Sequence, residues 1–340
     1  MAVLHVTTEG ARLVRKNGTL AIEKGGLQLH TLPIKQVRYV FLHPGTHVTE
    51  PARRLVLRNG GRLVHVARWG MPEGLTFGEV WPPAERVLAQ ARLLADRDRR
   101  LALARALVRG KLRSQAAYLD LRARWTLAKG KDPEPFAQAA ERIRALEERL
   151  ERASTLEELR GYEGVASRMY FESLRAYLQE KQVPFPGRRA YPPPDYANAA
   201  LSYGYGIVRS LVTLGVLSSG LLLGIGVVHE TQRNQPALAL DLLDLFRVVA
   251  VDMVVIRLLA NKNLSEKHAV VKGKSVYLNE KGREKLIKAI QKRLETAFHH
   301  PVLQRKRPLL ELIELEAARL AGAIVHGKDY EAFYLSKGEG

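Results

Sequence analysis

One segment constrains the fold of this chain more than any other, because almost every residue from 236 to 259 is apolar. It reads PALALDLLDLFRVVAVDMVVIRLL. A helix that is apolar on all sides must be buried nearly all round, so this segment requires a large domain of surrounding helices. It nevertheless contains Asp241, Asp244 and Asp252. Buried carboxylates are costly unless they are paired, hydrogen-bonded or bound to a cation, so these three residues need partners.

A second apolar stretch, residues 211–228, contains no charged residue. It has about the minimum length of a membrane span. Ser218, Ser219 and Gly220 interrupt it, and the sequence has no second candidate span. We therefore predict that residues 198–228 form a helical block in the protein core and that no membrane is a partner. The N-terminus lacks a basic start followed by an apolar run, so we expect a cytoplasmic location.

A proline pair at residues 82–83 divides the chain into two parts. Residues 1–81 contain short β-branched and aromatic runs separated by frequent turn residues, which predicts strands and one short helix over residues 50–57. In residues 84–340 the turn signals are about twenty or more residues apart, which predicts helices. The expected fold class is α+β, with a small β-rich N-terminal domain before a larger all-α catalytic domain.

Local patterns place the individual elements. Strands are predicted at residues 4–7, 19–22, 37–42 and 63–66, and the first two flank the turn-forming Lys16-Asn17-Gly18. Helices are predicted at residues 88–112, 136–153, 156–180, 198–228, 236–259, 280–298 and 309–325, with a small hairpin at 270–278. Five prolines between Pro184 and Pro194 predict an extended loop, and the tail at residues 338–340 is expected to fray.

The charge balance suggests the partner. The chain has 54 Lys and Arg against 35 Asp and Glu, a net charge of +19. Such a surface attracts polyanions, so nucleic acid is the default partner, with an acidic membrane surface or no fixed partner as the rivals. The chain contains no cysteine, which excludes disulfides, zinc sites made of thiolates and cysteine nucleophiles. Any metal must be held by His, Asp and Glu.

Helical periodicity relates the three aspartates of the apolar segment. Asp241 and Asp244 are three residues apart and share one face, and Asp252 returns to nearly the same direction after about three turns. Pairing with Arg247, Arg257 or arginines of neighbouring helices would explain an isolated aspartate. We interpret Asp252 in this way.

His229 changes the interpretation of Asp241 and Asp244, because it stands at the end of the preceding apolar stretch. A histidine that emerges from a buried helix beside two carboxylates is a plausible site for a hard metal ion. The residues alone leave open whether the group binds a metal or forms a hydrogen-bonded cluster in the core.

Glu163 lies in the helical pattern LRGYEGVASRMYFESL, where Gly164 would allow close approach of another element. The inward face of this helix is expected to consist of Val165, Ala166, Met169 and Tyr170. A single glutamate on a helix is most often a surface or structural residue. Nothing in the local pattern marks Glu163 further.

Four ordered motifs give these residues a context. Glu163-Gly164-Val165-Ala166 with Tyr170-Phe171 resembles E-G-x-A-x-x-x-Y-[FY], and residues 195–205, DYANAALSYGY, resemble D-x-x-N-A-x-L-[SN]-[YF]-x-Y. Residues 226–229, GVVH, match G-x-x-H, and residues 240–247, LDLLDLFR, resemble L-D-[LI]-x-[ED]-x-[FY]-R. Together they resemble the CRISPR-associated adaptation endonuclease/integrase family, the Cas-one family.

The resemblance implies a metal site. In that family the first glutamate, the histidine and the second acid of the last motif hold the metal, which implies Glu163, His229 and Asp244 here, with Asp241 as a supporting residue. Many members carry glutamate in place of Asp244 and proline in place of Val248. Aspartate is one methylene shorter, but it is still a hard oxygen ligand suited to Mg²⁺ or Mn²⁺.

The resemblance also implies a function in antiviral defence. A metal-dependent endonuclease and integrase would insert short DNA fragments into a CRISPR array by transesterification, with a terminal hydroxyl of the DNA as nucleophile. The expected assembly has homodimers, formed by the N-terminal domain, that are bridged by the small ferredoxin-like Cas-two protein. Residues 85–131 carry thirteen Lys and Arg against four acids. This could be a solvated face, but we expect phosphate contacts for some of Arg97, Arg99, Arg100, Arg105 and Arg109.

Two alternatives remain at this stage. One is a nuclease or resolvase that acts on branched DNA with the same site. The other is a noncatalytic basic scaffold that binds DNA, in which the acidic cluster would be a metal-free network of ion pairs.

Overall fold

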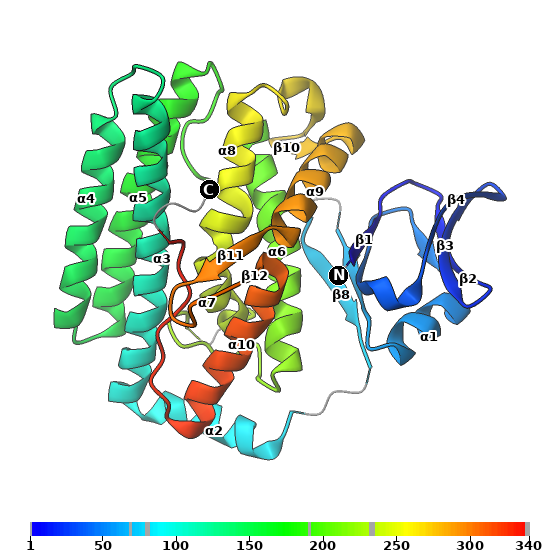
Figure 1. The fold of residues 1–340 in the computed structure, drawn as a ribbon, viewed down its shortest axis with the longest axis horizontal. Coiled ribbons are helices and arrows are strands. Elements are labelled where there is room, and N and C mark those ends of the chain that lie inside the picture. Colours follow the sequence, from blue (N-terminus) through cyan, green and yellow to red (C-terminus); the bar gives the residue numbers. More distant parts are fainter. Residues whose placement is uncertain (1, 68–69, 79–81, 190–191, 231–234, 337–340) are drawn as a thin grey trace.

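The computed structural model describes residues 2–67, 70–78, 82–189, 192–230 and 235–336. A strand-rich N-terminal part lies at one end of the molecule and a larger helical part forms the rest (Figure 1). This arrangement confirms the predicted α+β class. The tail predicted to fray, residues 338–340, lies outside the described residues.

The N-terminal part contains two four-stranded sheets and helix α1 (Glu50–Arg58). One sheet has the order β1-β5-β7-β8, and the other has the order β4-β3-β2-β6. The strands are β1 (Ala2–Val6), β2 (Arg12–Lys16), β3 (Thr19–Lys24), β4 (Leu27–Leu32), β5 (Val37–Leu42), β6 (His47–Val48), β7 (Arg62–Val66) and β8 (Pro72–Thr76).

The turn at Asn17-Gly18 joins β2 to β3, not the segment at residues 4–7 that we placed before it. Asn17 has φ 49° and Gly18 has φ 78°, and a two-residue turn with both φ values positive joins directly adjacent antiparallel strands. β2 was missed because only two of its five residues are apolar. β1 instead pairs with β5 in parallel.

The helical part contains most of the predicted helices. They are α2 (Ala84–Ala95), α3 (Arg97–Leu127), α4 (Glu134–Arg149), α5 (Leu156–Glu180), α6 (Tyr196–Ser218), α7 (Ala237–Phe246), α8 (Met253–Ala260), α9 (Glu280–Glu295) and α10 (Leu309–His326). Short 3₁₀ turns occur at Ile34–Gln36, Leu150–Arg152 and Glu266–His268. Helix α3 packs against α4, α5 and α7, and α6 packs against α7 and α10.

Helix α6 is the one helix among the described residues that is long and apolar enough to cross a membrane, but 83% of its most apolar window is buried inside the protein. It is therefore a core helix. It ends at Ser218, ten residues before the predicted end of this block. Gly220 adopts φ 64°, and Ser219 donates its hydroxyl hydrogen bond to the Gly215 carbonyl 2.9 Å away. The following residues to 229 form no regular element.

The apolar segment that opened the sequence argument is buried as predicted, but it is not a uniform helix. A π-helical turn, η3 (Arg247–Asp252), connects α7 to α8. A π turn holds more residues than an α turn, so side chains after it point in directions that a period of 3.6 does not predict. Asp252 stands at its end.

Two hairpins complete the helical part, so it is not all-α as predicted. β9 (Ala269–Lys272) and β10 (Ser275–Leu278) confirm the predicted hairpin. β11 (Ala297–His300) and β12 (Arg305–Pro308) were not predicted, and β11 takes residues that we assigned to the end of α9.

The two parts share a core. Val3, Tyr39, Phe41 and Val64 of the β1-β5-β7-β8 sheet belong to the main hydrophobic cluster with the helices. The second cluster lies within the N-terminal part, between its sheets and α1. The β1-β5-β7-β8 sheet therefore packs directly against the helical part.

Candidate active site

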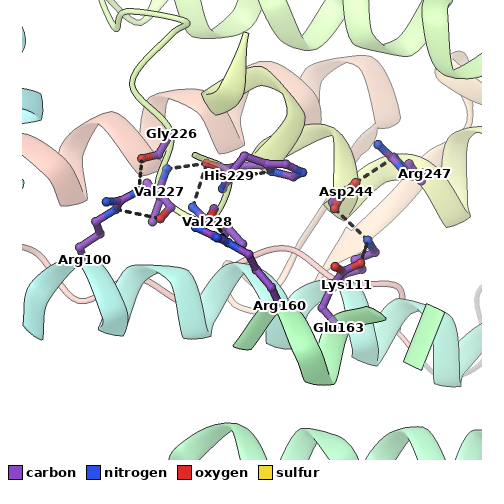
Figure 2. Close-up of polar contacts among 11 residues, drawn as sticks. Arg100, Lys111, Arg160, Glu163, Gly226, Val227, Val228, His229, Asp244 and Arg247 are labelled. Carbon is purple, nitrogen blue, oxygen red and sulfur yellow. Dashed lines mark hydrogen bonds and ion pairs between the residues drawn. The ribbon is translucent and has the colours of Figure 1, made fainter. Parts of the chain in front are cut away.

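The four residues singled out from the sequence lie around one cavity of about 130 Å³, which we call the carboxylate cavity. Glu163 comes from α5, Asp241 and Asp244 come from α7, and His229 comes from the segment between α6 and α7. Residues that are up to 81 positions apart in the chain are thus brought together (Figure 2).

Asp241 organises the segment that carries His229. Its buried carboxylate accepts backbone hydrogen bonds from Val227 (2.5 Å), Val228 (3.1 Å) and His229 (2.8 Å). It is 2% exposed, so these bonds replace the water that the charge has lost. The segment is held at a fixed position on α7.

Gly226 makes this close approach possible. A Cβ at this position would lie 2.6 Å from the His229 carbonyl oxygen and 2.7 Å from the Ala237 Cβ. The carbonyl groups of the same segment are bound from the other side, since Arg100 donates to Val227 at 3.1 Å and Arg160 donates to Val228 at 2.9 Å (Figure 2). Steric crowding therefore explains why the G-x-x-H motif has a glycine at this position.

His229 lies at the end of this irregular segment. We had predicted that it would emerge from a helix, and that prediction was wrong. Its Nδ1 lies 2.6 Å from Asp241 Oδ1. This hydrogen bond to Asp241 raises the pKa of His229 against the effect of burial. If Nδ1 is the donor, the neutral ring keeps the Nε2 lone pair for another partner.

Lys111 of α3 stands between the two other carboxylates. Its ammonium forms an ion pair with Glu163 and lies 2.8 Å from Asp244 Oδ2 (Figure 2). Lys111 is 7% exposed. Burial lowers its pKa, but Asp244 and Glu163 outweigh this and leave the pKa raised, so the ammonium is charged. Ser167 also donates to Glu163, at 3.0 Å.

Asp244 is held between two cations. Arg247 Nε lies 2.8 Å from Asp244 Oδ1, although the geometry is too bent for a hydrogen bond, so both buried atoms keep unused hydrogen-bonding capacity. Burial raises the pKa of Asp244, but Arg247 and Lys111 lower it to about 2. Asp244 is therefore an anion at any ordinary pH.

The donor chemistry of the carboxylate cavity fits a hard divalent ion. The two carboxylates are the oxygen ligands that suit Mg²⁺ and Mn²⁺, whereas an imidazole nitrogen is more typical of transition-metal sites. In the part of the chain that the structure describes, Oδ1 of Asp244 has no hydrogen-bond partner. Within the described residues, however, no three such side chains converge on one point. The ammonium of Lys111 occupies the place between Glu163 and Asp244 instead.

A cavity of about 510 Å³ adjoins the carboxylate cavity and shares Lys111, Glu163 and Asp244 with it. Further cations line it, among them Arg168 and Arg175. It is large enough for a nucleotide-sized group. An anionic substrate in it would lie beside Glu163 and Asp244.

Gly164 lines this cavity, and a Cβ there would meet nothing within 4 Å. The expected close approach of another element at Gly164 was wrong. The glycine keeps the wall beside Glu163 open. Val165 was also misplaced, since it is 39% exposed, whereas Ala166 and Tyr170 are fully buried as predicted.

Asp252 accepts hydrogen bonds from hydroxyl groups, and among the described residues no arginine forms an ion pair with it, contrary to our interpretation; Arg247 and Arg188 only lower its pKa electrostatically. Tyr205 donates to it at 2.5 Å and Tyr170 at 3.0 Å. Burial raises the pKa of Asp252 to about 6, and the two hydrogen bonds only partly offset this.

A third cavity, of about 430 Å³, shares Arg188, Tyr205 and Arg247 with the 510 Å³ cavity. Arg188 belongs to the proline-rich loop and donates to Asn198 Oδ1 at 3.1 Å. Asn198 also accepts from the Arg189 backbone at 2.8 Å, so the N-terminus of α6 fixes the loop. The three cavities form a series along the site.

Most of the arginines proposed to contact phosphate have partners inside the protein. Arg99 donates to carbonyl groups of α10, Arg100 to the segment before His229, and Arg105 to carbonyl groups at residues 150 and 153. Arg109 pairs with Glu151. Arg97 is exposed. Contact of these arginines with phosphate stays a prediction.

The sequence argument missed Lys111, which was one cation among thirteen in a basic stretch. The neighbouring Gly110 was an available signal. A Cβ at Gly110 would lie 2.8 Å from the Leu245 side chain and 2.8 Å from the Phe333 carbonyl oxygen. This glycine marks where α3 meets α7, close to the position of the lysine.

Comparison with known proteins identifies the family of the chain. The model of the family "CRISPR associated protein Cas1" matches residues 4–292. A CRISPR-associated endonuclease Cas1 from Thermus thermophilus is 39% identical over 332 residues, which cover 98% of this chain and 99% of that protein. A Cas4/Cas1 fusion from Rhodospirillum rubrum is 30% identical over 94% of this chain and 55% of the fusion.

Solved structures share the fold. A casposase bound to an integration product aligns with a TM-score of 0.81 over 100% of this chain and 95% of that chain, at 19% identity. A Cas1 protein from Thermotoga maritima aligns with a TM-score of 0.77 over 96% and 97%, at 20% identity.

Fold and site together define a two-part protein whose helical part gathers carboxylates, an imidazole and several cations around connected cavities. The chain belongs to the Cas1 family of CRISPR-associated proteins.

Proposed function

We propose that this protein is a DNA endonuclease and integrase of CRISPR adaptation that depends on a divalent metal. The observation that carries the proposal is the meeting of Glu163, His229, Asp241 and Asp244 around one cavity. Glu163, His229 and Asp244 would hold Mg²⁺ or Mn²⁺, and Asp241 would orient the imidazole. When bound, such an ion polarises a phosphate and stabilises the charge that grows on its oxygens.

The proposed reaction is a transesterification. A terminal hydroxyl of the incoming DNA fragment forms a new bond to phosphorus in the CRISPR repeat, the repeat's own P–O bond breaks, and the departing strand leaves with a free hydroxyl. No side chain acts as nucleophile. Arg168, Arg175 and Arg188, which line the 510 Å³ cavity, would neutralise the DNA phosphates as they approach.

The proposed partners follow from the relatives. One structure of the same fold is a Cas6-RT-Cas1–Cas2 complex, aligned with a TM-score of 0.78 over 100% of this chain and 36% of that chain. Another, with a TM-score of 0.58 over 94% and 91%, is a Cas1–DNA complex. We propose that this chain acts in the cytoplasm as a homodimer, formed by the N-terminal part, that binds DNA and a small Cas2-type protein.

The test is strand transfer in vitro. The protein, with and without the Cas2-type partner, is incubated with fragment DNA, repeat DNA and Mn²⁺, and joined product is measured. Joined product is expected from wild type and from Glu141→Gln, an exposed acid on α4, and not from Glu163→Gln. Cleavage without joined product would instead support a branched-DNA nuclease or resolvase.

One observation favours a second candidate, the noncatalytic scaffold. Glu163 and Asp244 are closed on Lys111, as a metal-free network of ion pairs would be. In that case Glu163→Gln, His229→Ala and Asp244→Asn would lower stability and leave DNA binding and every other activity unchanged. Loss of metal-dependent joining with DNA binding retained would exclude this candidate.

A further inference from the structure

The largest cavity described lies away from the proposed active site. It has a volume of about 1060 Å³ and lies where α3, α5 and α8 reach their C-terminal ends. We call it the arginine cavity, after Arg122, Arg257 and Arg293, which line it together with Trp125 and Tyr177. Arg122 follows Lys111 on α3 by eleven residues, a distance of about 16 Å along the helix. The cavity is therefore separate from the carboxylate cavity.

Its charge is not compensated. Six cationic and two acidic side chains line it, and one of the acids, Glu180, pairs with Lys131 at 3.4 Å. Cations near helix C-termini are favoured by the helix dipoles, which accounts for Arg257 and Lys181. Arg293 also lies in the last turn of its helix, α9, but its pKa is lowered to about 10, first by burial and then by Arg257.

Arg122 is the residue that most needs a partner. It is 8% exposed, and within the part of the chain that the structure describes, its buried Nε has no hydrogen-bond partner and no carboxylate pairs with it. The guanidinium carbon lies 3.6 Å from the centre of the Tyr177 ring and 5.6 Å from that of Trp125. A buried guanidinium held against rings is oriented and ready to bind an anion.

Trp125 supplies a different contact. It is 38% exposed, so a large part of this apolar ring faces solvent at the cavity. Exposed aromatic rings beside clustered arginines are the combination that binds unpaired nucleotides, because bases stack on the rings while the phosphates pair with the cations. A duplex cannot offer its base faces in this way.

We propose that the arginine cavity binds an unpaired nucleotide, with its base against Trp125 and its phosphate against Arg122, Arg257 and Arg293. The nucleotide is either part of a single strand or free in solution, and both have the same chemistry. The proposal goes beyond the proposed function and rests on it only in the choice of DNA over RNA as the probe.

The test measures binding of single-stranded DNA in EDTA, which removes divalent metal, so that catalysis does not affect the result. The chain has three tryptophans, and a Trp69→Phe/Trp81→Phe protein leaves Trp125 as the only one. A fluorescein-labelled eight-nucleotide single strand of DNA is expected to quench its emission, because a stacked base quenches tryptophan. In fluorescence anisotropy Trp125→Ala should weaken binding on the order of tenfold, the loss typical of one stacked base.

Charge variants locate the phosphate. Arg122→Gln and Arg257→Gln are each expected to weaken binding about fivefold or more, as charge-assisted hydrogen bonds do. Arg142→Gln, which removes the same charge from an exposed position on α4, should leave binding unchanged. Circular dichroism checks folding, and Arg257, which is exposed, keeps the test valid if Arg122→Gln unfolds the protein.

Competitors identify the ligand. Unlabelled single strand should compete best, and competition by dTMP at similar concentration would identify a free nucleotide as the ligand. The proposal is overturned if Trp125 emission does not change, if Arg142→Gln matches Arg257→Gln, or if blunt duplex or inorganic phosphate competes as well as single strand. Quenching in a protein that never joins DNA would contradict the proposed function alone.

Discussion

The carboxylate cavity and the arginine cavity lie along the same helices and treat charge in opposite ways. In the first, Lys111 neutralises Glu163 and Asp244, and backbone amides surround Asp241. In the second, Arg122 and Arg293 line a cavity in which cations outnumber acids. The paired charges of the carboxylate cavity hold its side chains in a fixed geometry. The excess cations of the arginine cavity are available to bind an anionic ligand.

Replacing Lys111 should have the largest effect on stability of the changes considered for the two cavities. Lys111→Met leaves two carboxylates without their buried partner, and the free energy of unfolding is expected to fall by about 4 kcal/mol, as for a broken buried ion pair. Urea denaturation measures it. Arg257→Gln at the arginine cavity removes a cation that forms no ion pair with the described residues, and should lower stability by about 1 kcal/mol at most, the contribution of a cation at a helix C-terminus.

Mn²⁺ adds a second measurement. Its addition should raise the melting temperature of Lys111→Met more than that of the wild type, because the metal takes the place of the ammonium. Equal stability of Lys111→Met and wild type without metal would show that the lysine neutralises nothing.

Asp252, on the helix between the two cavities, should make stability depend on pH. Its pKa is raised by burial from 3.8 to about 6, so the native state binds its proton more tightly than the unfolded state. The stability it contributes is complete below about pH 4 and is lost as pH rises through about 6, by up to about 3 kcal/mol. Urea denaturation of wild type and Asp252→Asn between pH 4 and 7.5 isolates this slope. A constant difference between the two proteins would refute it.

Gly226 tests how closely the His229 segment is held. Gly226→Ala places a Cβ 2.6 Å from the His229 carbonyl oxygen, and we expect a loss of about 2 kcal/mol in the free energy of unfolding. Gly224→Ala is the matched control, since a Cβ there meets nothing within 4 Å. If the two alanine variants unfold at the same urea concentration, the segment is looser than described.

The sequence allowed the fold class and most helices to be predicted, because proline, glycine and long apolar runs act locally. Ser218, Ser219 and Gly220 interrupt the apolar run where α6 ends, but we extended the predicted helix past them because apolar residues follow. The π turn was invisible in the sequence, because apolar residues on every side leave no periodicity to read.

The residues of the candidate site also divide into those that the local sequence indicated and those that it did not. Asp241 and Asp244 were suspicious because charge in an apolar helix needs a cause. Glu163 came from the resemblance alone. Lys111 was missed because burial of a basic residue depends on α7 and α5, which are 52 or more residues away in the chain. Long-range packing, not local pattern, decides which cations of a basic stretch are exposed.

The central claim is that the carboxylate cavity binds a divalent metal, and titration calorimetry with Mn²⁺ tests it most directly. Wild type and Glu141→Gln should bind Mn²⁺ at a common site. Glu163→Gln and Asp244→Asn should bind it at least about a hundredfold more weakly, because losing a ligand exceeds the 10- to 100-fold cost of losing a residue that only supports one. Equal Mn²⁺ affinity in all four folded proteins would contradict the account.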